Sequence, residues 1–101
     1  MSEKTLRVIN HLEVVSGTEE KSKSLLLELV ERSRQETGCI KCELLQNKFN
    51  QAEFALVSEW DSKAAFQAHL YSKSAVEEFL REDSELLAKA PDIRQYQLLS
   101  P

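Results

Sequence analysis

The chain has 101 residues, of which 42% are hydrophobic and 30% charged, a balance typical of one globular domain rather than a disordered segment. The formal net charge is −4 and basic residues form no cluster, which argues against a nucleic-acid partner. No apolar run reaches the roughly 20 residues of a membrane span, and Met1 to Thr5 do not resemble a secretory signal. We therefore expect one domain over residues 1–101, without a membrane partner, in the cytoplasm, where thiols are reduced.

The first predicted element is a strand over residues 6–15, because apolar and polar residues alternate there. Asn10 falls on the face of this strand that should be buried. A buried amide without a hydrogen bond costs about 1–3 kcal/mol, so Asn10 needs either a functional role or a local partner at a bulge or strand end. The remainder of that face is apolar and consists of Leu6, Val8, Leu12 and Val14.

The next predicted element is a helix from about Glu19 to Glu36, with Thr18 as its N-cap and Gly38 at its C-terminal end. Its buried stripe contains Leu26, Leu29, Val30 and Ser33. Asp61 or Ser62 is expected to cap a second helix. The other predicted elements are strands over 39–47 and 53–60, a helical region from Lys63 towards Leu87 with a break at 72–74, and a last strand over 93–99.

This order of elements, β-α-β-β-α-β, predicts an α+β domain of the ferredoxin-like kind, with a four-stranded antiparallel sheet and helices on one face. Two helices cover only one face of such a sheet. The other face would expose aliphatic side chains to water, and exposed apolar faces mark interaction surfaces. We therefore expect a homodimer that forms through the sheet face.

Three blocks of the sequence resemble the antibiotic biosynthesis monooxygenase family in both order and spacing. They are Leu12-Glu13-Val14-Val15-Ser16-Gly17, then Glu36-Thr37-Gly38-Cys39, then Glu59-Trp60-Asp61-Ser62 through Ala65-Phe66 to Ala68-His69-Leu70. The resemblance covers nearly the whole chain and implies a dimeric α+β barrel with a pocket between sheet and helices. Its relatives include oxygenases of quinols and anthrones that need no metal or flavin, haem-degrading oxygenases and an isomerase.

The resemblance also implies roles for particular residues. Asn10 matches a pocket asparagine on the first strand, and His69 is a candidate base for a phenolic substrate. Trp60 is common in the family whatever the chemistry, which favours packing over a place in the pocket wall. Phe66 is likewise favoured as a core residue, with substrate contact as the alternative.

Two other groups are not expected to carry chemistry. Cys39 and Cys42 have the spacing of a redox or metal pair, but on a regular strand residues three apart point to opposite faces. His11 has no partner that would complete a metal site. We therefore expect neither a metal site nor a cofactor.

The sequence departs from two subgroups of the family that it resembles. Phe79 stands where haem-degrading members have their iron ligand, which disfavours haem degradation. Leu56 and Phe66 replace an asparagine and a tyrosine of the polyketide oxygenases. The working hypothesis is a cofactor-independent monooxygenase of a small aromatic quinol-like or anthrone-like molecule, with dioxygen as second substrate. The alternatives are an isomerase or other non-oxygenase enzyme on the same scaffold, and a non-catalytic dimer that binds a small molecule.

Overall fold

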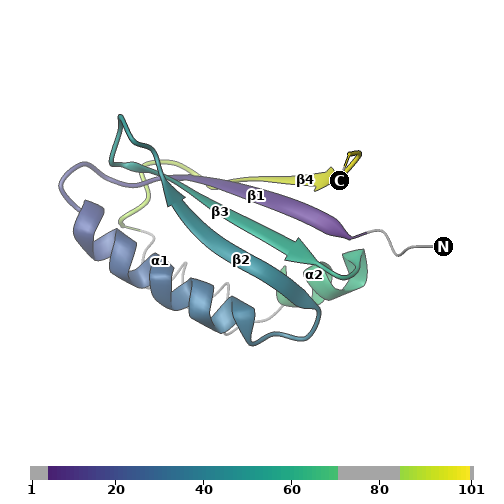
Figure 1. Ribbon diagram of the computed structural model, residues 1–101. Helices are drawn as coiled ribbons and strands as arrows, with labels where there is room; N and C mark the ends of the chain where they lie inside the picture. Colours follow the sequence, from purple (N-terminus) through teal and green to yellow (C-terminus); the bar gives the residue numbers. More distant parts are fainter. Residues whose placement is uncertain (1–4, 71–84, 101) are drawn as a thin grey trace.

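The computed structural model describes residues 5–70 and 85–100, and it confirms the predicted α+β fold (Figure 1). The four strands form one antiparallel sheet in the order β2-β3-β1-β4. Both helices lie on the same side of this sheet (Figure 1). The elements are β1 (Leu6–Glu13), α1 (Glu19–Arg34), β2 (Cys39–Gln46), β3 (Glu53–Trp60), α2 (Lys63–Leu70) and β4 (Asp92–Gln97).

The predicted bounds of the first four elements hold to within two residues, and the predicted start of α2 at Lys63 also holds. The predicted break at 72–74 and the helix through Val76, Phe79 and Leu80 lie outside the described residues. At the start of the second described range, the backbone N–H of Val15 donates to the carbonyl oxygen of Leu86 at 2.6 Å, and that of Ala88 donates to Glu13 at 2.7 Å. The chain near Leu87 therefore forms a β-bridge with Val14, just after β1, and not the helix that was predicted there.

The helix face of the sheet carries two apolar clusters. The large cluster lies against α1. A hydrogen bond also links α1 to β2, because Arg34 Nε donates to the Cys42 carbonyl oxygen at 3.0 Å. The small cluster lies against α2 and contains Val8, Trp60 and Phe66. Cys39 contacts both clusters. The large cluster consists of Leu12, Val14, Leu26, Val30, Cys42, Phe54 and Leu56.

Gly38 brings the start of α2 against the turn that follows α1. Its φ is +89°, a conformation that residues with a side chain rarely adopt. A Cβ atom here would overlap with Cβ of Ala65 and would lie 3.0 Å from Oδ1 of Asp61. The backbone N–H of Asp61 also donates to the Gly38 carbonyl oxygen at 2.8 Å. The position of α2 therefore depends on a residue without a side chain at 38.

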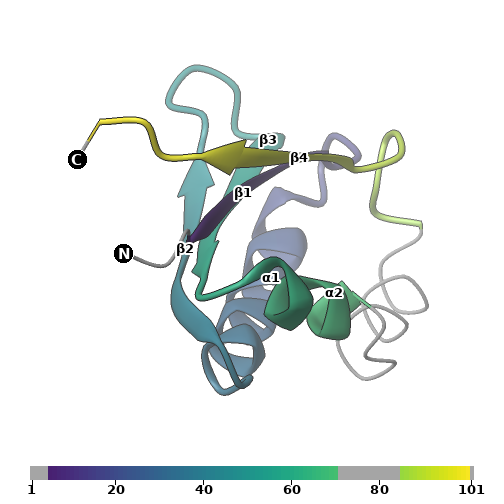
Figure 2. The ribbon, with the colours of Figure 1, turned by 90° about the vertical axis from the view of Figure 1, so that its right-hand side faces the viewer.

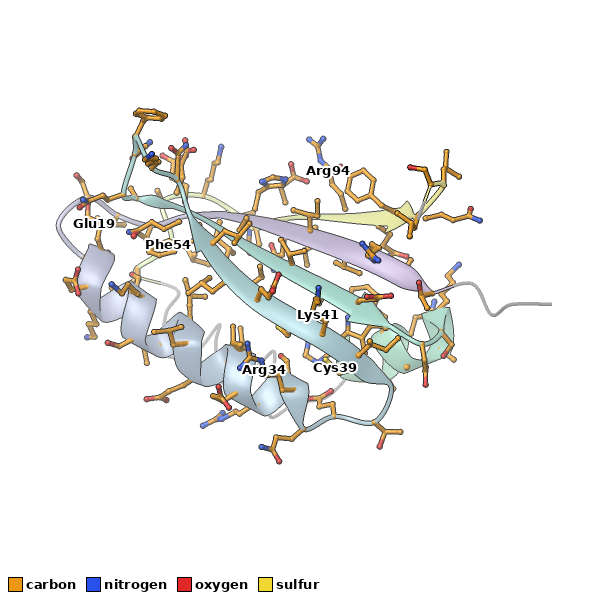
Figure 3. All side chains as sticks on the ribbon, in the orientation of Figure 1. Glu19, Arg34, Cys39, Lys41, Phe54 and Arg94 are labelled. Atoms are coloured by element: carbon orange, nitrogen blue, oxygen red, sulfur yellow. The ribbon has the colours of Figure 1, made fainter. Side chains whose placement is uncertain are left out.

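The outer face of the sheet, which points away from both helices, has a mixed character. Ile9 and Val57 form its centre as direct cross-strand partners and are only half-buried. Tyr96 is also exposed on this face. Arg94 projects from β4 on the same side (Figure 3) and pairs with Asp92 at 2.9 Å. An apolar centre with charged neighbours is typical of a protein–protein interface.

Replacing Gly38 by alanine should lower the free energy of unfolding by about 3 kcal/mol or more, because backbone strain adds to the clash with Ala65. Gly17 is the matched control, since its φ of +97° is also positive but no atom of the described residues lies within 4 Å of the position that a Cβ would take. Gly17→Ala should cost only about 1 kcal/mol. Urea denaturation measures both values, and equal losses would contradict the close approach of α2.

Candidate functional site

Three ring side chains from β3 and α2 lie together at the small cluster, to which Trp60 and Phe66 belong. The ring centroids of Trp60 and His69 are 4.8 Å apart, and those of Trp60 and Phe66 are 5.9 Å apart. Trp60 is only 1% exposed. Three of the four predicted site residues thus come together, with the imidazole held against an apolar wall.

The local sequence explains how α2 presents this wall. Ser62 is the N-cap: its Oγ accepts a hydrogen bond from the backbone N–H of Ala65 at 3.1 Å, which decides between the two predicted caps. Phe66 and His69 are three residues apart and therefore share one face of α2. That face turns towards Trp60.

Glu36 completes the group, although the sequence pattern indicated no role for it. His69 Nδ1 lies 2.8 Å from Oε1 of Glu36, and the two side chains are 15% and 23% exposed. A carboxylate only accepts, so Nδ1 carries the proton in this contact, and the neutral form of the imidazole has its lone pair on Nε2. The pair spans 33 residues, so only the fold brings it together. The sequence offered one indication of a place for Glu36, which is that it lies two residues before Gly38, in the turn after α1.

Asn10 lies on the helix face between the two clusters. Val8, two residues before it, belongs to the small cluster, and Leu12, two residues after it, belongs to the large one. Its Oδ1 atom is buried and has no hydrogen-bond partner among residues 5–70 and 85–100. A polar strip, Asn10 and Ser58, thus separates the clusters, and Ser58 Oγ accepts from Nε1 of Trp60 at 3.0 Å. Asn10 Oδ1 is the acceptor that remains open.

The structure does not join Asn10 and His69 directly. They share no hydrogen bond, but both lie on the helix side of the sheet. Asn10 lies two residues, or about 7 Å along β1, from Val8. Val8 belongs to the same cluster as Trp60.

The cysteine pair differs from its predicted geometry. A bulge between Cys39 and Lys41 shifts the register, so that Cys39 pairs with Trp60 and Cys42 with Ser58. Both thiols therefore lie on the helix face, and the expectation of opposite faces was wrong because it assumed a regular strand. Burial raises the pKa of Cys42 to about 11, and burial followed by the charge of Glu36 raises that of Cys39. Raised thiol pKa values disfavour a reactive pair.

No metal site is visible in residues 5–70 and 85–100, where no three His, Cys, Asp or Glu side chains gather as ligands. His11 lies exposed on the outer face, opposite Ala55 and Asp92. Within the same ranges, no helix combines the length and the apolar character of a membrane span.

The comparison with known families agrees with the resemblance seen in the sequence. The family model for antibiotic biosynthesis monooxygenase matches residues 5–81. The chain belongs to the antibiotic biosynthesis monooxygenase family. No functionally curated protein matches it significantly.

Solved structures show the same fold across the family. A Pseudomonas aeruginosa protein shares 26% identity, with 99% of each chain covered and a TM-score of 0.88. A Mycobacterium tuberculosis protein shares 20% identity, with 96% of this chain and 97% of that chain covered and a TM-score of 0.84. A third structure, described as an antibiotic biosynthesis monooxygenase, shares 20% identity, with 94% and 99% covered and a TM-score of 0.84. Since some family members are monooxygenases, membership narrows the chemistry without naming a substrate.

Replacing Asn10 by leucine should raise the free energy of unfolding by about 1 kcal/mol, because it removes a buried oxygen to which no described residue donates a hydrogen bond. Asn50→Leu is the control, because the Asn50 side chain bonds both Glu53 and the backbone N–H of Ala52. The control should lose stability by a similar amount in urea denaturation. A loss of stability in Asn10→Leu comparable to that of the control would show that the amide is satisfied.

Proposed function

We propose that this member of the antibiotic biosynthesis monooxygenase family is a cofactor-independent monooxygenase of a small aromatic quinol-like or anthrone-like molecule. The observation that carries the proposal is a half-buried imidazole, held at Nδ1 by Glu36, on the same side of the sheet as the unpartnered Oδ1 of Asn10. The His69 imidazole would accept a proton from the substrate, and Asn10 Oδ1 would orient a substrate hydroxyl. Such polar groups beside apolar walls suit a phenolic ring.

In this proposal His69 is the general base and Glu36 positions it. Nε2 removes a proton from the bound quinol or anthrone, and the Glu36 carboxylate provides the counter-charge for the imidazolium that forms. The resulting electron-rich anion reacts with dioxygen directly, which is why no metal or flavin is required. With an anthrone, the ring methylene carbon loses both hydrogens and becomes a carbonyl carbon. One oxygen atom of dioxygen forms that carbonyl group, and the other is reduced and leaves with the two hydrogens as water.

Asn10, Trp60 and Phe66 supply the binding part of the proposed site. Asn10 Oδ1 accepts a hydrogen bond from a substrate hydroxyl, which offsets the cost of burying that oxygen. The Trp60 and Phe66 rings form the apolar wall behind the imidazole and keep water away from the anion.

We also propose that the protein acts as a homodimer through the outer face. The half-buried Ile9 and Val57 at its centre would be covered by the same residues of a second copy in a two-fold arrangement. The cytoplasmic location expected from the sequence stays a prediction.

An isomerase is the second candidate, and the Glu36–His69 pair is the observation that favours it. A carboxylate-held imidazole moves a proton between two atoms of a substrate without any need for dioxygen. A non-catalytic binding dimer is the third alternative, in which Asn10 would affect affinity alone.

An oxygen-electrode assay with a panel of quinols and anthrones tests the proposal. The wild-type protein should consume dioxygen with at least one compound. His69→Gln and Glu36→Gln should each lower kcat, by about 10²-fold or more for the base and less for the positioning residue. Asn10→Leu should mainly raise KM, since it removes a contact made by the bound substrate.

Lys63→Gln is the control variant, because Lys63 lies exposed in the first turn of α2. Product formation without dioxygen uptake would support the isomerase instead. Saturable binding of a panel member without turnover would support the binding dimer. Unchanged rates in all three site variants would show that the site lies elsewhere.

A further inference from the structure

The turn between β2 and β3 holds an aromatic side chain almost entirely in water. Phe49 is 93% exposed. The turn does not need this ring, because its order comes from polar contacts: Asn47 Oδ1 accepts from the N–H of Phe49 at 2.7 Å, and Asn50 Oδ1 accepts from that of Ala52 at 3.1 Å. Both asparagine amides also donate to the Glu53 carboxylate. A turn held by polar contacts thus presents a phenyl ring that packs against little of the described part of its own subunit.

A hollow with a volume of about 220 Å³ lies at the same end of the sheet. It is lined by His11, Glu13, Glu53, Lys89 and Asp92, together with the core residues Leu12 and Phe54. Glu13 and Glu53 are direct partners across β1 and β3, and both belong to the outer face with His11. The hollow therefore borders the face through which the homodimer is proposed to form.

Symmetry connects the turn and the hollow. Two sheets that pack face to face are related by a two-fold axis that lies in the plane between them. An axis along the strands exchanges the two edges of the sheet but keeps each end in place. The β2–β3 turn and the start of β4 lie at one end of the sheet but belong to its two opposite edges, β2 and β4 (Figures 1 and 2). Such an axis brings the turn of one copy over the hollow of the other.

We propose that Phe49 of each subunit inserts into the hollow of the partner subunit, so that two such contacts clamp the dimer at one end. This inference rests on the proposed homodimer and adds the direction of its axis. The turn rises on the side of the sheet away from the helices, towards the second copy (Figure 1). An axis across the strands would instead keep each edge in place and exchange the two ends, so the turn would lie over the Cys39 and Trp60 end of the partner's β2 and β3.

The charges around the ring and the hollow are complementary. Lys48 precedes Phe49 and is exposed. The hollow has three carboxylates and one ammonium group, that of Lys89, which lies 3.4 Å from Glu13. Arg94 pairs with Asp92 at its edge. Two like charges directly opposite each other, Glu13 and Glu53, are unfavourable, so the Lys48 ammonium of the second copy would relieve them.

Sedimentation equilibrium of the purified full chain tests the contact. Phe49→Ser should raise the dimer dissociation constant by at least about tenfold, as expected for a buried aromatic anchor. Leu99→Ser is the matched control, since Leu99 is 87% exposed at the opposite end of the sheet and should change the constant by less than about twofold. A larger increase of the dissociation constant in Leu99→Ser than in Phe49→Ser would contradict an axis along the strands.

A photo-crosslinking phenylalanine analogue at position 49 identifies the contact independently. In a mixture of isotope-labelled and unlabelled chains, crosslinks should join position 49 to a peptide of the other chain from residues 85–94. Crosslinks confined to one chain, or to residues 38–41 or 58–62 of the other, would overturn the insertion. If Phe49→Ser leaves the dimer dissociation constant unchanged, the insertion is wrong but the homodimer stands. If the wild-type protein is a monomer at micromolar concentration, the proposed homodimer is wrong as well.

Discussion

The close approach of Gly38 to α2 determines the geometry of the candidate site. Because residue 38 has no side chain, Ala65 and Asp61 lie directly against the turn after α1. That turn contains Glu36, and α2 contains His69, so one tight contact between two segments brings a carboxylate to 2.8 Å from an imidazole. Trp60, which ends β3, supplies the surface against which the imidazole lies. The packing of the fold and the chemistry proposed for it thus have the same origin.

The placement of both helices on one side of the sheet gives its two faces different roles. The helix face is dry enough that an amide oxygen without a partner is costly, so Asn10 gains by contact with a ligand hydroxyl. The outer face combines an apolar centre with charged neighbours, and neither helix covers it (Figure 1). One face therefore suits a small aromatic molecule and the other suits a second copy of the chain.

Local patterns predicted what depends on local geometry. Alternation located the strands, the helical stripe of α1 was confirmed by the burial of Leu26, Val30 and Ser33, and Asn10 stood out because it broke an apolar face. The pattern failed at Ile40, where one extra residue in a bulge turned Cys39 to the other face. It could not find the Glu36–His69 pair, because side-chain periodicity says nothing about contacts between residues distant in sequence. The exposure of the Phe49 ring could not be predicted for a similar reason, since a polar turn sequence predicts a loop but not which side chains the loop exposes.

The position of the proton on His69 decides whether Glu36 holds a base in place. Nitrogen-15 NMR of the imidazole at pH 8, where an ordinary histidine is neutral, distinguishes the two tautomers. We expect the proton on Nδ1 and an unprotonated Nε2 in the wild-type protein, with loss of this preference in Glu36→Gln. A proton on Nε2, or the same spectrum in both proteins, would contradict a base positioned by Glu36.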